Sequence, residues 1–90
     1  MEKKEFIKRV KEQLELAKND MSSERNVLDI RVSRHPYCVD DDAIFLPSEL
    51  DSAYEFIKDS SLWYLDIYEN IEEEGIAVYL DHSIIAMPAY

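Results

Sequence analysis

The apolar residues of the first 21 positions recur at alternating intervals of three and four residues. An α-helix completes a turn about every 3.6 residues, so this spacing brings the apolar side chains onto one face. Oppositely charged residues four apart, such as Glu5 and Arg9, support the other, exposed face. Residues 2–21 therefore predict an amphipathic helix that docks on a sheet or, alternatively, forms a coiled-coil seam. The apolar positions are Ile7, Val10, Leu14, Ala17 and Met21, with Phe6 beside them.

Residues 26–33 follow the period of a strand instead. Leu28, Ile30 and Val32 fall on one side of an extended chain, and charged residues fall on the other. This alternation predicts a half-buried strand, which the polar residues 19–25 separate from the helix.

A strand, a proline and a second helix are predicted for residues 43–58. The apolar run 43–46 stops at Pro47. Ser48 follows as an N-cap residue, with Asp51 as a partial capping box. The apolar residues after this cap keep helical spacing to the end of the stretch.

Residues 62–74 fit two structures. Their apolar spacing could continue a helix that Gly75 caps, whereas their aromatic residues favour a strand and their glutamates would oppose the helix dipole. We expect a strand over residues 62–69 and an acidic turn ending at Gly75. Further strands are expected over residues 76–80 and 83–87.

These elements predict an α+β fold, in which an antiparallel sheet of about four or five strands is packed by two helices. A chain of 90 residues has room for one small domain, so residues 1–90 are expected to form a single acidic unit. The hydrophobic fraction of 47% excludes a disordered chain, and no apolar run reaches transmembrane or signal-peptide length. The single cysteine cannot form an internal disulfide, which favours a reduced, cytoplasmic protein.

Charge is distributed unevenly along the chain, whose formal net charge is −10. Residues 1–34 carry nine Lys and Arg against seven Asp and Glu, whereas residues 35–90 carry thirteen acids and one base, Lys58. Such an acidic field repels nucleic acid and acidic membranes and attracts basic proteins. We therefore expect a basic DNA-binding protein as the partner, with no direct binding to nucleic acid or membrane. A merely solubilising surface is the alternative.

The sequence offers little for catalysis or metal binding. Cys38 lies three residues after His35, but the aspartates at 40–42 disfavour the thiolate that a nucleophile requires. No paired ligands match a zinc site, and the aspartate run lacks the spacing and glycine of a calcium loop. A single glycine excludes a glycine-rich phosphate loop. We expect no catalytic residue, no metal site and no cofactor.

Acidic and aromatic residues alternate in the second half of the chain. Aromatic rings are the usual anchors of protein interfaces, and complementary charges steer association. Carboxylates spaced like phosphates can also occupy a partner's nucleic-acid-binding groove, which already presents Arg and Lys. Alternatively, some of these rings belong to the core. The residues are Tyr54, Glu55, Trp63, Asp66, Tyr68, Glu69, Tyr79 and Asp81.

Residues 41–50, DDAIFLPSEL, combine an acidic strand, a Leu-Pro pair and the acidic start of a helix. Residues 68–78, YENIEEEGIAV, combine a tyrosine, an acidic turn and an apolar strand. In this order, over roughly residues 41–80, they resemble the phage uracil-DNA glycosylase inhibitor family, mostly by residue class. The resemblance implies a non-enzymatic protein that mimics DNA and fills the glycosylase's DNA-binding cleft, in the cytoplasm of a bacterial host.

The resemblance also implies the contact residues. In the family an acidic edge strand enters the enzyme's cleft, and an apolar pocket between helix and sheet captures an apolar side chain of the enzyme. The positions that match the strand and the helix start are Asp41, Asp42, Ile44 and Glu49. The positions that would line the pocket are Phe45, Leu50, Ala53, Tyr54, Tyr64, Ala77 and Tyr79.

The favoured hypothesis is therefore an acidic inhibitor of a uracil-DNA glycosylase. One alternative is an inhibitor of another nucleic-acid-processing enzyme, of the anti-restriction, anti-CRISPR or nuclease-immunity type. Another is a small structural domain that dimerises through the apolar stripe of the first helix. An enzyme is the least favoured class, and we expect a monomer or a weak dimer.

Overall fold

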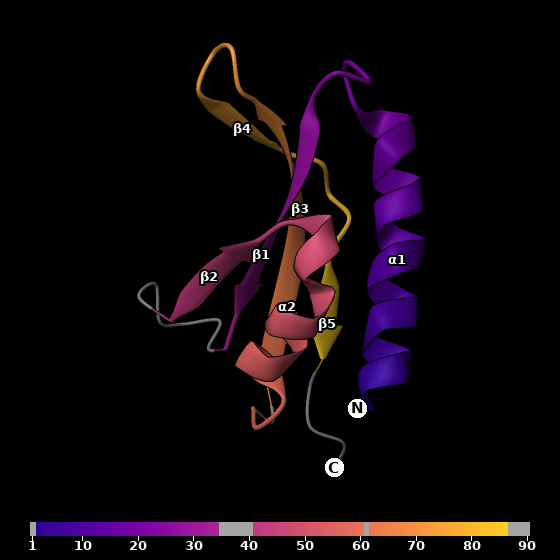
Figure 1. The fold of residues 1–90 in the computed structure, drawn as a ribbon, viewed down its shortest axis with the longest axis vertical. Coiled ribbons are helices and arrows are strands. Elements are labelled where there is room, and N and C mark those ends of the chain that lie inside the picture. The colour runs from indigo at the N-terminus through magenta and orange to yellow at the C-terminus, as the bar shows by residue number, and fades with distance from the viewer. Residues whose placement is uncertain (1, 35–40, 61, 87–90) are drawn as a thin grey trace.

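Two α-helices cover one face of a five-stranded antiparallel sheet in the computed structural model, which describes residues 2–34, 41–60 and 62–86 (Figure 1). The α+β class predicted from the sequence is confirmed. The elements in chain order are α1 (Lys3–Asp20), β1 (Val27–Ser33), β2 (Asp42–Phe45), a 3-10 turn (Pro47–Glu49), α2 (Leu50–Ile57), β3 (Trp63–Ile71), β4 (Ile76–Tyr79) and β5 (Ile84–Ala86).

α1 buries the predicted apolar stripe inside the domain. Val10, Leu14 and Ala17 are buried as predicted, but at the start of the stripe Phe6 is fully buried and Ile7 only partly buried. The Phe6 ring lies 5.6 Å from that of Tyr54 and 5.5 Å from that of Trp63, measured between centroids. Because the stripe packs on α2 and the sheet, its buried positions are not exposed to form a seam with a second copy. These positions are Phe6, Val10, Leu14 and Ala17.

β3 is the central strand of the sheet. β1 pairs with it along its whole length, and β2 lies outside β1. On the other edge, β4 pairs with the C-terminal half of β3 and β5 with its N-terminal end. Asp81, whose φ is 59°, turns the chain between these two strands.

The ambiguous residues 62–74 form a strand through Ile71 and then an acidic turn, so the helical alternative is wrong. Gly75 closes this turn with a φ of 65°, a conformation that glycine adopts without steric cost. Its N–H donates to the Ile71 carbonyl at 2.9 Å. The strand extends two residues beyond the predicted 62–69 because β1 and β4 pair with its far end.

The start of α2 differs from the prediction in one detail. Ser48 is not its N-cap, because Pro47–Glu49 forms a 3-10 turn before the helix. Glu49 Oε1 accepts a hydrogen bond from the Leu46 N–H at 2.8 Å and so caps that turn.

The hydrophobic core lies between the helices and one face of the sheet. Alternate residues of β1 and β3 point toward the helices and are almost completely buried, as their alternation predicts. Their partners come from the buried sides of α1 and α2. The core members from β1, α2 and β3 are Leu28, Ile30, Val32, Leu50, Ala53, Ile57, Trp63, Leu65 and Ile67. Neither described helix combines the length and hydrophobicity that crossing a membrane would require.

Candidate protein-binding surface

The residues implied by the family resemblance lie on both faces of the sheet. The members on the helix side are Phe45, Leu50, Ala53 and Tyr54. The members on the opposite side are Tyr64, Ala77 and Tyr79. Leu50 and Ala53 are core residues with 6% and 0% of their surface exposed, so they cannot contact a partner directly. The seven residues therefore do not line one pocket, because the sheet itself separates them.

The side of the sheet that faces away from the helices is the candidate surface, and we refer to it as the open face. Strand pairing places its side chains together, since residues opposite each other in an antiparallel pair point to the same side. Ile44, Tyr79 and Ile85 are 67%, 47% and 62% exposed there. Ser33 lies on this side too but is buried. The accessible residues of the open face are Val27, Asp29, Arg31, Asp42, Ile44, Tyr64, Asp66, Tyr68, Asn70, Ala77, Tyr79 and Ile85.

Two tyrosines lie side by side across β3 and β4 on the open face. The ring centroids of Tyr68 and Tyr79 are 5.5 Å apart, and the rings are tilted by 51°. The Tyr79 hydroxyl lies 2.7 Å from Ser83 Oγ, which donates to Asp66 Oδ1 at 2.7 Å. These bonds fix the orientation of a half-exposed ring, which is the kind of rigid anchor that protein interfaces use.

Carboxylates outnumber cations on the open face. Asp29 accepts a hydrogen bond from Asn70 Nδ2 at 3.0 Å and has no cationic partner among the described residues. Asp66 likewise has only the Ser83 hydroxyl as a partner among them. The one cation on this face, Arg31, donates from Nε to Asp42 Oδ2 at 2.6 Å. The open face is therefore negative overall.

The neighbours of Arg31 further stabilise a guanidinium that is charged at any ordinary pH. The hydrogen bond to Asp42, and next the one to Tyr68, raise the pKa of its guanidinium above the ordinary value. The residue thus links β1, β2 and β3 through side chains on one surface. Its role is to fix the Asp42 carboxylate rather than to leave a free charge.

A shallow pocket of about 380 Å³ lies in the open face. It brings together three of the predicted contact residues with three others. Its lining residues are Asp29, Arg31, Asp42, Ile44, Tyr68 and Ala77. Sequence reasoning did not select Asp29 or Arg31 as contact residues, although the alternation of residues 26–33 placed both on the outer side of that strand.

The acids predicted to enter a partner's cleft are paired within the protein. Asp41 forms an ion pair with Arg34, whose Nε lies 2.7 Å from Asp41 Oδ1. The Arg34 guanidinium also lies over the Phe56 ring, 4.3 Å from its centroid. Asp42 is paired with Arg31, and the Glu49 carboxylate caps the turn before α2. Binding a partner through these carboxylates would require them to share or exchange their present partners.

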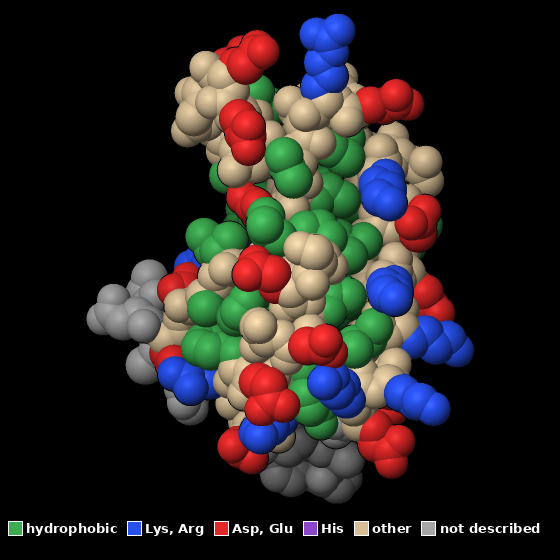
Figure 2. Space-filling view, viewed as in Figure 1, with side chains coloured by type: hydrophobic (Ala, Val, Ile, Leu, Met, Phe, Trp, Pro, Cys, Tyr) green, Lys and Arg blue, Asp and Glu red, His purple; other side chains and the backbone are tan. Residues whose placement is uncertain are grey.

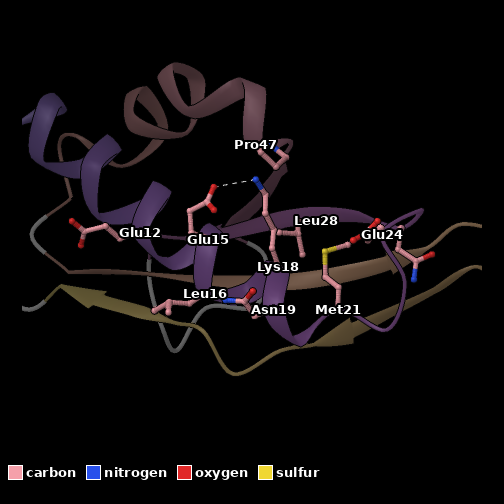
Figure 3. Close-up of a pocket in the computed structure, with 10 residues that line it drawn as sticks. Glu12, Glu15, Leu16, Lys18, Asn19, Met21, Glu24, Leu28 and Pro47 are labelled. Atoms are coloured by element: carbon pink, nitrogen blue, oxygen red, sulfur yellow. Dashed lines mark hydrogen bonds and ion pairs between the residues drawn. The ribbon is translucent and has the colours of Figure 1, made fainter.

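A groove of about 890 Å³ lies on the helix side, between the C-terminal half of α1, the start of β1 and Pro47 (Figure 3). Apolar side chains such as Leu16, Met21 and Leu28 line it, and the Lys18–Glu15 ion pair of 3.1 Å crosses its rim. No nucleophile with an adjacent base faces it among the residues that line it. Figure 2 shows apolar side chains exposed over this side of the molecule, between α1 and the β3–β4 hairpin.

The structure describes only some of the residues considered for nucleophilic catalysis or metal binding. Cys38, His35 and Asp40 fall outside the described residues. His82 Nε2 lies 2.5 Å from Asp20 Oδ2, which ties the loop before β5 to the end of α1. Within residues 2–34, 41–60 and 62–86, no group of three or more His, Cys, Asp or Glu side chains could hold a metal ion.

Comparison of the chain with models of protein families, with curated proteins and with solved structures finds no match. The surface itself offers an open face with paired tyrosines, exposed isoleucines and an excess of carboxylates.

Proposed function

We propose that the protein is a non-enzymatic, acidic inhibitor that binds the basic cleft of a DNA-binding protein through its open face. A uracil-DNA glycosylase is the first target to test, because of the sequence resemblance over residues 41–80. The observation that carries the proposal is the open face itself, which combines a tyrosine pair with uncompensated carboxylates. Aromatic anchors supply binding energy, and the carboxylates supply orientation and a fast on-rate.

The arrangement favours binding over catalysis. The carboxylates of the open face are half-buried on the sheet surface, where water can reach them, and the pocket between them is shallow. General acid–base catalysis instead needs a carboxyl group shielded from water beside one that is not. Exposed isoleucines at positions 44 and 85 widen the surface that a partner could cover.

The test is uracil excision by a bacterial uracil-DNA glycosylase while this protein is titrated in at fixed salt. We expect inhibition that reaches completion near a one-to-one ratio. The inhibition should weaken as salt rises, because screening shortens the range of the attraction. Absence of inhibition at large excess would reject the glycosylase as the target.

Two pairs of variants locate the contact. Asp29→Asn with Asp66→Asn removes both uncompensated charges of the open face, and we expect the inhibition constant to rise at least about tenfold. Asp59→Asn with Glu12→Gln removes the same number of charges from exposed positions outside the open face, where neither acid has a cationic partner among the described residues, and serves as the matched control. Equal effects of the two pairs would show that only total charge matters and would contradict binding through the open face.

A further inference from the structure

β4 is an edge strand whose outer side pairs with no other described strand. It bonds only to β3, and β5 occupies a different part of the same β3 edge. In Figure 1 the β3–β4 hairpin projects to the upper left, away from both helices. The strand is therefore accessible along its length.

The backbone of β4 presents unpaired groups in a defined pattern. The Leu80 N–H donates to the Ile67 carbonyl at 3.2 Å, which marks this pair as a hydrogen-bonded one. Bonded and non-bonded pairs alternate in an antiparallel ladder, so Val78 and Ile76 also direct their backbone groups toward β3. It follows that the N–H and C=O groups of Ala77 and Tyr79 point outward, where another strand could pair with them.

β4 also lacks the usual protection of a sheet edge. Native edge strands are commonly blocked by lysine, proline, a bulge or a covering element. β4 is Ile-Ala-Val-Tyr, and three of its side chains, Ile76, Val78 and Tyr79, are 47%, 38% and 47% exposed. The opposite edge strand, β2, has a proline two residues after its end and is flanked by two arginine–aspartate ion pairs.

Acidic residues stand at both ends of this unprotected strand. The glutamates at 72–74 precede it, are exposed, and have no cationic partner among the described residues. Asp81 follows it, and no Lys or Arg occurs anywhere after Lys58. A strand that pairs with β4 would therefore be favoured by positive charge at both of its ends.

A second copy of this chain fits the edge poorly. Antiparallel pairing of two β4 strands would bring the acidic turn of one copy toward Asp81 of the other, and like charges across a strand pair are destabilising. Each copy also carries a net charge of −10.

We propose that β4 binds an extended segment of a partner protein as an additional strand, and that this segment combines apolar residues with basic residues at both of its ends. Main-chain hydrogen bonds to Ala77 and Tyr79 would supply affinity, and the acids around them would select for basic character. The inference depends neither on the identity of the target nor on binding through the open face.

The experiment uses the full chain and a nine-residue peptide of alternating valine and lysine with blocked ends. Amide hydrogen exchange is followed by NMR with the peptide at about ten times its Kd. We expect the Ala77 and Tyr79 amides to exchange quickly in the free protein and about tenfold more slowly in the complex. The Ile76 and Val78 amides, which already face β3, should change far less.

Control peptides and variants distinguish main-chain pairing at the β4 edge from non-specific attraction between a basic peptide and an acidic protein. A peptide with glutamate in place of lysine tests the charge, and one with proline at alternate positions tests the main-chain bonds. On the protein, Ala77→Pro removes an outward N–H and leaves the β3 ladder intact, so affinity should fall at least about tenfold. Ala77→Thr keeps the N–H and should change affinity less than about twofold. A melting curve for each variant shows whether it is folded.

The acidic turn is tested with a matched pair of triple variants. Glu72→Gln, Glu73→Gln and Glu74→Gln together should weaken peptide binding and flatten its salt dependence. Glu2→Gln, Glu5→Gln and Glu12→Gln remove the same charge from α1 and should leave both nearly unchanged.

Three outcomes would overturn the inference: no binding of the basic peptide at millimolar concentration, binding without protection of Ala77 and Tyr79, or protection that grows with protein concentration alone. The last would identify a second copy as the occupant. If the protein binds the peptide but does not inhibit the glycosylase, the glycosylase is rejected as the target and this inference still holds.

Discussion

Glu69 is a carboxylate with only 2% of its surface exposed, and it holds the loop after α1 against β3. It accepts hydrogen bonds from the Ser22 N–H at 2.9 Å, the Ser22 hydroxyl at 2.8 Å and Asn26 Nδ2 at 2.6 Å. The bond from Asn26, and next that from the Ser22 backbone, lower the pKa of Glu69. A carboxylate with this many donors has a structural role. No local sequence pattern reveals that role, because Glu69 lies among acids that are expected at the surface.

The lowered pKa has a consequence for stability. Because the folded protein holds the charged form of Glu69 more strongly than the unfolded chain does, its contribution is complete above the ordinary glutamate pKa. That contribution is lost as the pH falls from there through the lowered pKa of the folded state. We expect Glu69→Gln to lower the Tm at pH 7 by several degrees and to flatten the fall of Tm in acid.

The matched control is Glu73→Gln, at an exposed position of the turn after β3. It should leave both the Tm at neutral pH and its acid dependence nearly unchanged. Identical pH profiles for wild type and Glu69→Gln, measured by circular dichroism, would show that Glu69 adds no pH-dependent stability.

Ser33 presents the opposite case, a buried hydroxyl without a partner. Among the described residues its Oγ is a buried side-chain atom with no hydrogen-bond partner, and the residue is 2% exposed. Burying an unpaired hydroxyl is unfavourable, so Ser33→Ala should leave the free energy of unfolding unchanged or raise it by up to about 1 kcal/mol. Urea denaturation measures this. Ser83→Ala is the comparison, and it should be destabilising because Ser83 Oγ donates to Asp66.

At the scale of elements, the docking of α1 rests on Phe6 more than on Ile7. Phe6 is fully buried and contacts the rings of Tyr54 and Trp63, whereas Ile7 lies at the margin of the core. We expect Phe6→Ala to cost about 3–5 kcal/mol and Ile7→Ala clearly less. Chemical denaturation of both variants tests the order. Equal losses of stability would mean that Ile7 contributes to the core as much as Phe6 does, as the apolar spacing of the sequence predicts.

Most helices and strands could be predicted from local sequence patterns, because hydrophobic periodicity and turn-forming residues act over only a few positions. The alternation of residues 26–33, the proline after β2 and the glycine of the acidic turn each fixed an element that the structure contains. The capping of α2 was missed because it depends on a 3-10 turn, in which Glu49 rather than Ser48 reaches back to the chain.

The candidate surface was predictable only in part, because the side to which a residue points depends on strand pairing. Tyr64 and Tyr79 were grouped with Leu50 by their positions in the resembling family. Pairing of β3 with β1 and β4 puts both tyrosines on the open face, whereas Leu50 is in the core. Short-range sequence patterns do not carry this information.

At the scale of the whole molecule, the fold partly cancels the charge asymmetry of the sequence. Basic residues of the stretch 1–34 pair with acids of the remainder: Lys3 with Asp51, Arg31 with Asp42 and Arg34 with Asp41. The acids left without cations among the described residues include Asp29 and Asp66 on the open face and the glutamates at 72–74. Figure 2 shows basic and acidic side chains interspersed along α1, and acidic side chains on the hairpin.

This distribution predicts that salt acts in opposite directions on folding and on binding. With a net charge of −10, the folded chain repels itself over distances longer than any ion pair. The Debye length falls from about 30 Å at 0.01 M to about 8 Å at 0.15 M, so that repulsion is screened more than the close pairs are. The Tm should therefore rise over this range, while inhibition of the glycosylase and binding of the basic peptide weaken. The Glu72→Gln, Glu73→Gln and Glu74→Gln triple variant should show a smaller rise, and a Tm that falls with salt would mean that the ion pairs outweigh the repulsion.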